Sequence, residues 1–168
     1  QYPDFSANTL QGGDCTNFVS QALHTGGWQY TASRDDKSTN TWYVAWNNAK
    51  RAFTNSQTWS TAAGFYRRII NDKYEKSVLP TSDLYSLRPG DIAFLTSGGK
   101  SHHTMIVTGY QEKPWWNPFA SYGPLVSYHN GGVNPNTNMP NLPQQNILLT
   151  EVIARSPNDT PVFAKVRS

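Results

Sequence analysis

The spacing of apolar residues changes once along the chain, and this change separates predicted helices from predicted strands. Up to about Tyr74, apolar side chains recur at steps of three and four residues, which is typical of amphipathic helices. After Leu87 they come in short runs bounded by Gly, Pro and Asn, which favours strands. Helices are expected from Cys15 to the Gly26-Gly27 pair, over 41–55 and over 58–74. Strands are expected over 92–95, 103–110, 125–129, 147–155 and 162–166.

Helices followed by an antiparallel meander indicate an α+β fold, in which N-terminal helices pack on an antiparallel β-sheet. The 168 residues are enough for one hydrophobic core. Neither a repeat nor a linker divides them, so we expect a single domain over 1–168. In this arrangement the first helix packs against the strands that carry His103 and His129.

Composition limits where in or outside the cell the protein is expected and which partners it is expected to bind. No apolar run is long enough to span a membrane and no signal-peptide pattern is present, so we expect no membrane span. Because the sequence begins at Gln1, we interpret it as a processed protein or as one domain with partner domains outside it. Charged residues are only 15% while Asn, Ser, Thr and Trp are abundant, a profile common in proteins secreted by bacteria or held in their cell wall. The net charge of +3 favours anionic wall polymers. The basic residues are scattered and form no recognisable module, so no nucleic acid is expected as a partner.

Cys15 is the only cysteine, so no disulfide can form within the chain. It follows Gly12-Gly13 and Asp14, which suit a turn and a helix N-cap, and it occupies the first helical position. A thiol there lies at the positive end of the helix dipole, which lowers its pKa and favours the nucleophilic thiolate. The alternative is a buried cysteine acting as a small apolar side chain, and position alone leaves both open.

A nucleophilic cysteine needs a histidine to accept its proton, and the chain offers four. His24 lies near the end of the first helix and is expected to cap it. His102 and His103 are adjacent on a strand and point to opposite faces, so periodicity does not choose between them. The same divergence argues against a zinc site made from His102, His103 and His129, and we expect no metal.

Several motifs together resemble one family of enzymes. The run DCTNFVSQAL at 14–23 resembles the signature of the putative amidase domain family, a branch of the papain-like NlpC and CHAP superfamily of cell-wall hydrolases. This run is highly specific, and a cysteine early on a helix with a histidine later on a strand is the papain-like arrangement. Shorter matches are YPDF at 2–5, STNTW at 38–42, LRPGDI at 87–92, HTMIVTGY at 103–110 and VSYH at 126–129.

The resemblance implies a role for each matched residue. Cys15 is the nucleophile, His103 is the general base and acid, and His129 orients His103. His102 is then a neighbour of the base, and Asn130 is a rival for the orienting role. The acidic calcium loop of some CHAP enzymes is absent, so no cofactor is expected.

The oxyanion of the tetrahedral intermediate also needs hydrogen-bond donors. The backbone N–H of Cys15 is the first. The second is left open among Tyr2, Asn8 and Gln11.

The sequence thus predicts a cysteine amidase or peptidase that cleaves peptidoglycan, at the muramoyl-L-alanine amide or within the stem peptide. One alternative is a non-catalytic module that binds the cell wall or a glycan. Another is a secreted effector or toxin that cleaves or deamidates a protein. Four tryptophans either stack on sugar rings or belong to the core: Trp42, Trp46, Trp115 and Trp116.

Overall fold

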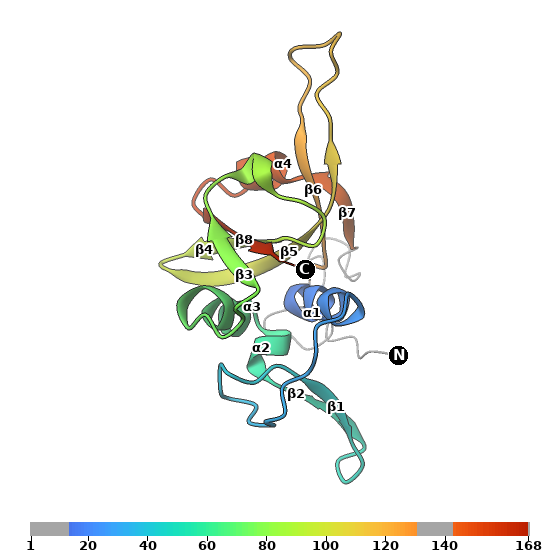
Figure 1. Ribbon diagram of the computed structural model, residues 1–168, viewed down its shortest axis with the longest axis vertical. Coiled ribbons are helices and arrows are strands. Elements are labelled where there is room, and N and C mark those ends of the chain that lie inside the picture. The colour runs from blue at the N-terminus through green and yellow to red at the C-terminus, as the bar shows by residue number, and fades with distance from the viewer. Residues whose placement is uncertain (1–13, 131–142, 168) are drawn as a thin grey trace, which may run out of the picture.

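A six-stranded antiparallel sheet is the centre of the structure, a computed structural model that describes residues 14–130 and 143–167 (Figure 1). Its strand order is β3-β8-β4-β5-β6-β7, and a separate hairpin is formed by β1 and β2. The strands of the large sheet are β3 (Val78–Thr81), β4 (Ile92–Ser97), β5 (Lys100–Gln111), β6 (Gly123–Tyr128), β7 (Gln144–Leu148) and β8 (Thr160–Val166). Helices with antiparallel sheets confirm the α+β prediction.

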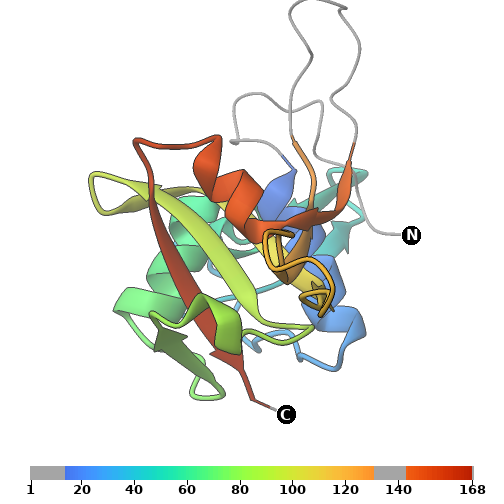
Figure 2. The same cartoon turned by 90° about the horizontal axis from the view of Figure 1, so that it is seen from above.

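Helices cover both faces of this sheet (Figure 2). The helix α1 (Cys15–Thr25) packs on one face, where Val19 shares a core with Ile106 of β5. The helix α4 (Leu149–Ala154) packs on the other, where Val152 shares a second core with Met105. Neighbouring residues of β5 therefore belong to different cores, as the alternation of a strand requires.

The predicted helix over 58–74 is confirmed in a broken form. It consists of α2 (Gln57–Ser60), α3 (Ala62–Tyr66) and the π-helical turn η2 (Arg67–Asn71), and a short 3₁₀ turn, η3 (Leu84–Ser86), follows later. The break lies at Thr61, whose extended backbone ends α2 and begins α3. The Thr61 hydroxyl accepts a hydrogen bond from the Gly64 N–H at 3.1 Å and so caps α3.

The predicted helix over 41–55 is wrong. Strands β1 (Val44–Asn47) and β2 (Ala52–Asn55) form a hairpin there, in which Trp46 pairs with Phe53. Trp42, Val44 and Trp46 are spaced by two residues, which fits a strand, but the longer apolar pattern also fitted a helix. Arg51 adopts a φ of 47° in the turn, a conformation that a helix does not contain.

The prediction of a strand over 147–155 is wrong in its second half. Strand β7 ends at Leu148 and α4 begins at the next residue. Leu149, Val152 and Ile153 recur at steps of three and four and pack in the second core. The other four strands, over 92–95, 103–110, 125–129 and 162–166, are confirmed to within a few residues.

The Pro-Gly-Asp turn before β4 has a structural role. Gly90 adopts a φ of +95°, which suits glycine, and Asp91 behind it is buried. The Asp91 carboxylate accepts hydrogen bonds from the backbone N–H of Arg88 (2.7 Å) and of Val166 (2.8 Å). This side chain therefore joins the start of β4 to the end of β8. Within the described ranges, no helix has the length and apolar content needed to cross a bilayer.

Candidate active site

Cys15 is the first residue of α1 and lies against β5. The residue is 3% exposed, and its thiol contacts the Thr16 hydroxyl at 3.7 Å. A hydrogen bond from the backbone of Thr104 also reaches the thiol. The hydroxyls of Thr16 and Thr104 are 3.0 Å apart and join the helix to the strand. The thiol therefore lies beside the residue that directly follows His103.

Burial raises the pKa of the Cys15 thiol above its ordinary value. Hydrogen bonds from Thr104 and Thr16 oppose this effect, and the negative charge of Asp14 adds to it. The prediction of a lowered pKa from the helix dipole is therefore wrong for the free protein. Desolvation of a thiolate outweighs the dipole when the sulfur is enclosed.

This electrostatic balance gives a first testable prediction. At pH 7 iodoacetamide should modify Cys15 more slowly than it modifies glutathione, because the buried thiol is protonated and shielded. The rate should rise about tenfold per pH unit through the alkaline range, as the thiolate fraction grows. Mass spectrometry of the alkylated protein measures this rate. A rate that is already constant below pH 7 would contradict the raised pKa.

His129 lies just after β6 and is bound by Asp14. The distance between His129 Nδ1 and Asp14 Oδ2 is 2.6 Å, and the Asp14 side chain is only 3% exposed. The imidazole also stacks on the Phe18 ring, with centroids 4.3 Å apart. Asp14 and Phe18 are one helical turn apart, so His129 lies along the first turn of α1, and its partner Asp14 directly precedes Cys15 in the sequence.

A chain of buried hydrogen bonds determines which atom donates and which accepts between His129 and Asp14. Trp59 Nε1, which can only donate, bonds to Asn17 Oδ1 at 2.7 Å. The Asn17 amide nitrogen therefore faces Asp14 and donates to its Oδ1 at 2.7 Å. The second carboxylate oxygen of Asp14 accepts a hydrogen bond from Nδ1–H of His129. In the neutral imidazole the other nitrogen, Nε2, is then an acceptor.

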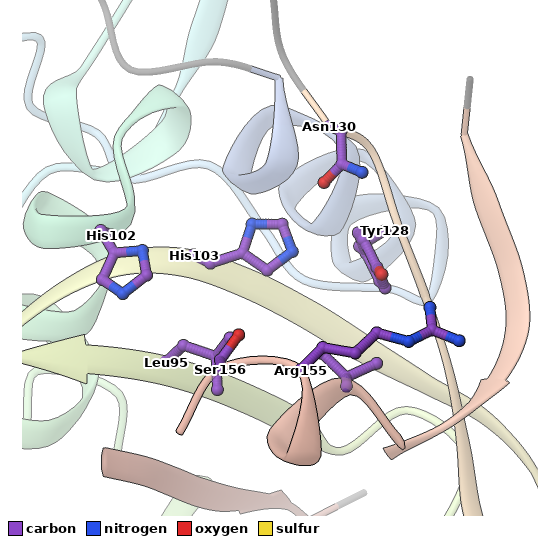
Figure 3. Close-up of a pocket in the computed structure, with 8 residues that line it drawn as sticks. Leu95, His102, His103, Tyr128, Asn130, Arg155 and Ser156 are labelled. Atoms are coloured by element: carbon purple, nitrogen blue, oxygen red, sulfur yellow. The ribbon is translucent and has the colours of Figure 1, made fainter. Parts of the chain in front are cut away.

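His103 points to the other face of β5, as alternation with Thr104 requires. Its ring lines a cavity of about 240 Å³ between β5, β6 and α4, together with Tyr128 and Arg155 (Figure 3). It meets the Tyr128 ring edge-on, with centroids 4.7 Å apart. Burial lowers the pKa of His103 to about 4, so the imidazole is neutral at pH 7. His102 adds to this shift and the carboxylate of Asp159 opposes it.

The structure thus brings Cys15 close to the backbone at His103 and close to the Asp14–His129 pair. Over residues 14–130 and 143–167, no hydrogen bond joins His103 to Cys15 or to His129. The orienting contact that the resemblance implies for His129 is replaced here by the contact with Asp14.

The other two histidines have partners away from the thiol. His102 is about half exposed, and its Nε2 lies 2.9 Å from Asp159 Oδ1. It lines the same cavity as His103, so the prediction that the two adjacent side chains diverge to opposite faces is wrong. His24 lies in the last turn of α1, and its Nδ1 is 2.7 Å from the carbonyl oxygen of Trp28. The Trp28 carbonyl lies beyond the last residue of α1, so this contact joins the helix end to the following loop and does not show the expected capping role. In the part of the chain that the structure describes, no three His, Cys, Asp or Glu side chains gather where a metal ion could bind.

The first predicted oxyanion donor lies at the start of α1. The first hydrogen bond within α1 runs from the Phe18 N–H to the Asp14 carbonyl oxygen at 2.9 Å. The backbone N–H of Cys15 precedes it and so has no acceptor inside the helix. The three candidates for a second donor lie outside the described residues: Tyr2, Asn8 and Gln11.

Sequence reasoning missed Asp14. We expected an N-cap, and Asp14 does occupy that position, but its side chain makes no capping hydrogen bond. Its carboxylate binds Asn17 and His129 instead. The local signal was an Asp-Cys pair with an Asn three residues after the Asp. The contact with His129 spans 115 positions and leaves no trace in local spacing.

Comparison with known proteins identifies the family of the chain. A family model described as "Putative amidase domain" matches residues 1–141. No curated protein and no solved structure matches the chain. The matched region covers most of the 168 residues. It contains Asp14, Cys15, His103 and His129. The chain belongs to this family of amidase domains.

Proposed function

We propose that this protein is a cysteine-dependent amide hydrolase of the papain-like type that cleaves peptidoglycan, secreted by a bacterium or held in its cell wall. The observation that carries the proposal is the position of the thiol. Cys15 begins α1, contacts the backbone next to His103 and follows Asp14, which binds His129. Membership of an amidase family supports amide hydrolysis as the reaction.

The proposed reaction has two steps. In the first, Sγ of Cys15 attacks the amide carbonyl carbon while its proton passes to His103, and the Cys15 N–H binds the oxyanion. His103 then gives the proton to the departing amine, the C–N bond breaks and a thioester remains. In the second step, water attacks the thioester, His103 takes its proton and returns it to the sulfur, and the carboxylic acid leaves.

The two pKa shifts define the resting state. A raised thiol pKa and a lowered His103 pKa both favour the neutral pair over thiolate and imidazolium. Proton transfer is therefore expected to accompany the attack on the carbonyl rather than precede it. The ring of His103 must also move toward the thiol, or the strand must twist locally, because the resting ring lies on the α4 side of β5.

The substrate proposal rests on the resemblance of the motifs and on the charge. A net charge of +3 favours contact with anionic wall polymers. The chemistry of the site suits either the muramoyl-L-alanine amide or a bond in the stem peptide. Both reactions use the same nucleophile and leave different products.

Digestion of purified peptidoglycan tests the proposal. Wild-type protein should release soluble fragments whose masses reveal a new amine and a new carboxylate at one kind of amide bond. Cys15→Ala should release none while keeping its far-UV circular dichroism spectrum and thermal midpoint. EDTA should not change the wild-type rate, because no step uses a metal.

Three outcomes would contradict the proposal in different ways. Binding to the wall without cleavage by either protein would favour a non-catalytic wall-binding module. Cleavage or deamidation of proteins, with intact peptidoglycan, would favour a secreted effector. Activity that survives Cys15→Ala would exclude Cys15 as the nucleophile.

A further inference from the structure

A second cavity, of about 480 Å³, lies beside the β1–β2 hairpin. Trp46 and Phe53 form a cross-strand pair on this hairpin, with ring centroids 5.2 Å apart and nearly perpendicular planes. Trp46 nevertheless remains 54% exposed and borders the cavity. The pair holds the indole at a fixed angle and leaves much of its surface open to a ligand.

The rest of the lining is polar. Arg34 and Asp36 lie on one side, and Asn48 and Lys50 lie in the hairpin turn. Within the described ranges, none of these four side chains has a hydrogen bond or ion pair, and the Arg34 guanidinium lies over the rings of Tyr43 (4.8 Å) and Tyr30 (5.9 Å). Donors and acceptors therefore line the cavity next to an aromatic ring, without a protein partner of their own.

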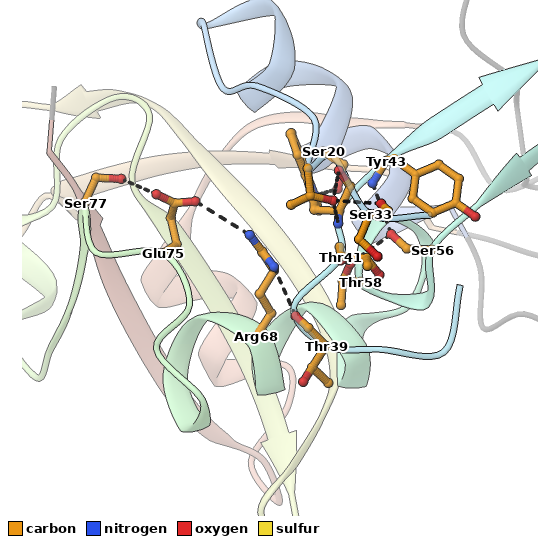
Figure 4. A network of polar contacts seen from close by, with 12 residues as sticks. Ser20, Ser33, Thr39, Thr41, Tyr43, Ser56, Thr58, Arg68, Glu75 and Ser77 are labelled. Atoms are coloured by element: carbon orange, nitrogen blue, oxygen red, sulfur yellow. Dashed lines mark hydrogen bonds and ion pairs between the residues drawn. The ribbon is translucent and has the colours of Figure 1, made fainter. Parts of the chain in front are cut away.

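Hydrogen bonds lie behind two of the lining residues, Tyr43 and Asp36. The Tyr43 N–H donates to the Ser56 hydroxyl at 3.1 Å, and the Ser56 and Thr58 hydroxyls are 2.9 Å apart. Thr58 in turn donates to the carbonyl oxygen of Thr41, within one buried cluster (Figure 4). The Gln57 N–H binds the Asp36 carbonyl oxygen at 2.8 Å, which ties the loop to the start of α2. A preformed cavity lowers the ordering cost of binding.

We propose that this cavity binds a neutral oligosaccharide of N-acetylated amino sugars. A pyranose ring has an apolar face of C–H groups that packs on an indole, and a rim of hydroxyl and amide groups that hydrogen bonds to amide and charged side chains. A sugar can use both of its surfaces only in a cavity that has an aromatic ring beside polar groups without other partners, and this cavity has both. This inference extends the proposed function, because such a site would hold the glycan strand of the substrate.

The other tryptophans that the sequence offered for sugar stacking differ from Trp46. Trp115 and Trp116 are 94% and 68% exposed, on the loop between β5 and β6 that projects away from the sheet (Figure 1). Trp42 is fully buried and belongs to the core, as one of our two sequence interpretations held. Trp116 therefore serves as a matched control for Trp46.

The test is calorimetric titration with the tetramer of N-acetylglucosamine, using Cys15→Ala protein so that binding does not depend on turnover. The tetramer should bind, and Trp46→Ala should weaken the affinity about tenfold or more through loss of the stacking surface. Trp116→Ala should bind as the parent does. Far-UV circular dichroism and thermal unfolding check each fold. If Trp46→Ala is destabilised, Asn48→Ala replaces it, since that exposed side chain leaves the Trp46–Phe53 pair intact.

Two results would overturn the proposal. One is that the tetramer does not bind, or that a wall stem peptide binds in its place. The other is that the Trp46 variant, or its Asn48 substitute, keeps the parent affinity. Loss of hydrolysis with retained tetramer binding would instead reject the amidase proposal and leave the glycan site standing.

Discussion

His103→Ala should lower the rate of peptidoglycan cleavage about 100- to 10,000-fold, the usual contribution of a positioned proton acceptor. The proposed mechanism uses His103 twice, to take the thiol proton and to protonate the leaving amine. Its neutral state at pH 7 leaves a nitrogen lone pair available. Cys15→Ala combined with His103→Ala should be no worse than Cys15→Ala alone, because residues that act as a unit are not additive.

The neighbouring histidines provide matched controls in one assay. His102→Ala should cost less than about tenfold, since that half-exposed ring already pairs with Asp159. His129→Ala should fall between the two, because it removes a ring beside Cys15 but leaves the base in place. If His102→Ala is the inactive variant and His103→Ala the mild one, the assignment on β5 is wrong by one residue.

Asp14→Asn should lower the rate about 10- to 100-fold, as loss of a supporting hydrogen bond usually does. Trp59 fixes the orientation of the Asn17 amide, whose nitrogen needs an acceptor at position 14. The oxygen of an asparagine there would meet this need, and its nitrogen would then face His129. His129 Nδ1 must become an acceptor, so its proton moves to Nε2, the nitrogen available to the site.

Nitrogen NMR of the His129 ring separates this effect from a loss of folding. The wild type should show the Nδ1–H form at high pH and Asp14→Asn the Nε2–H form. Circular dichroism should be unchanged. The prediction fails if both proteins show the same tautomer, or if the variant cleaves at the wild-type rate with its tautomer reversed.

Much of the fold was predictable because local patterns agreed with the final packing. The strand with Met105 and Ile106 alternates between two cores, and the Gly26-Gly27 pair ends the first helix as expected. The β1–β2 hairpin was not predictable in this way. Trp42, Val44 and Trp46 satisfy both a helical and a two-residue pattern. In the folded chain Thr58 donates to the Thr41 carbonyl oxygen, a contact across 17 positions that local spacing does not reveal.

For the candidate site as well, features set by local sequence could be predicted and features set by the packing of distant elements could not. The position of Cys15 at a helix start followed from its flanking Gly and Asp residues. The direction of its pKa shift did not, because burial depends on how β5 covers the thiol. The partner of His129 could not be predicted either. A hydrogen bond to Asp14 requires the end of β6 to meet the start of α1, which is a property of the sheet order.

The place of β8 in the sheet has a consequence for synthesis on the ribosome. Residues 160–166 form the strand between β3 and β4, and the Val166 N–H supplies one of the two backbone donors to Asp91. A nascent chain that has emerged only as far as the end of the family match at residue 141 still lacks this strand. It also lacks β7, so the edges of β3 and β4 that pair with β8 and the edge of β6 that pairs with β7 stay unpaired until late in biosynthesis. Unpaired strand edges are sites for chaperone binding and for aggregation.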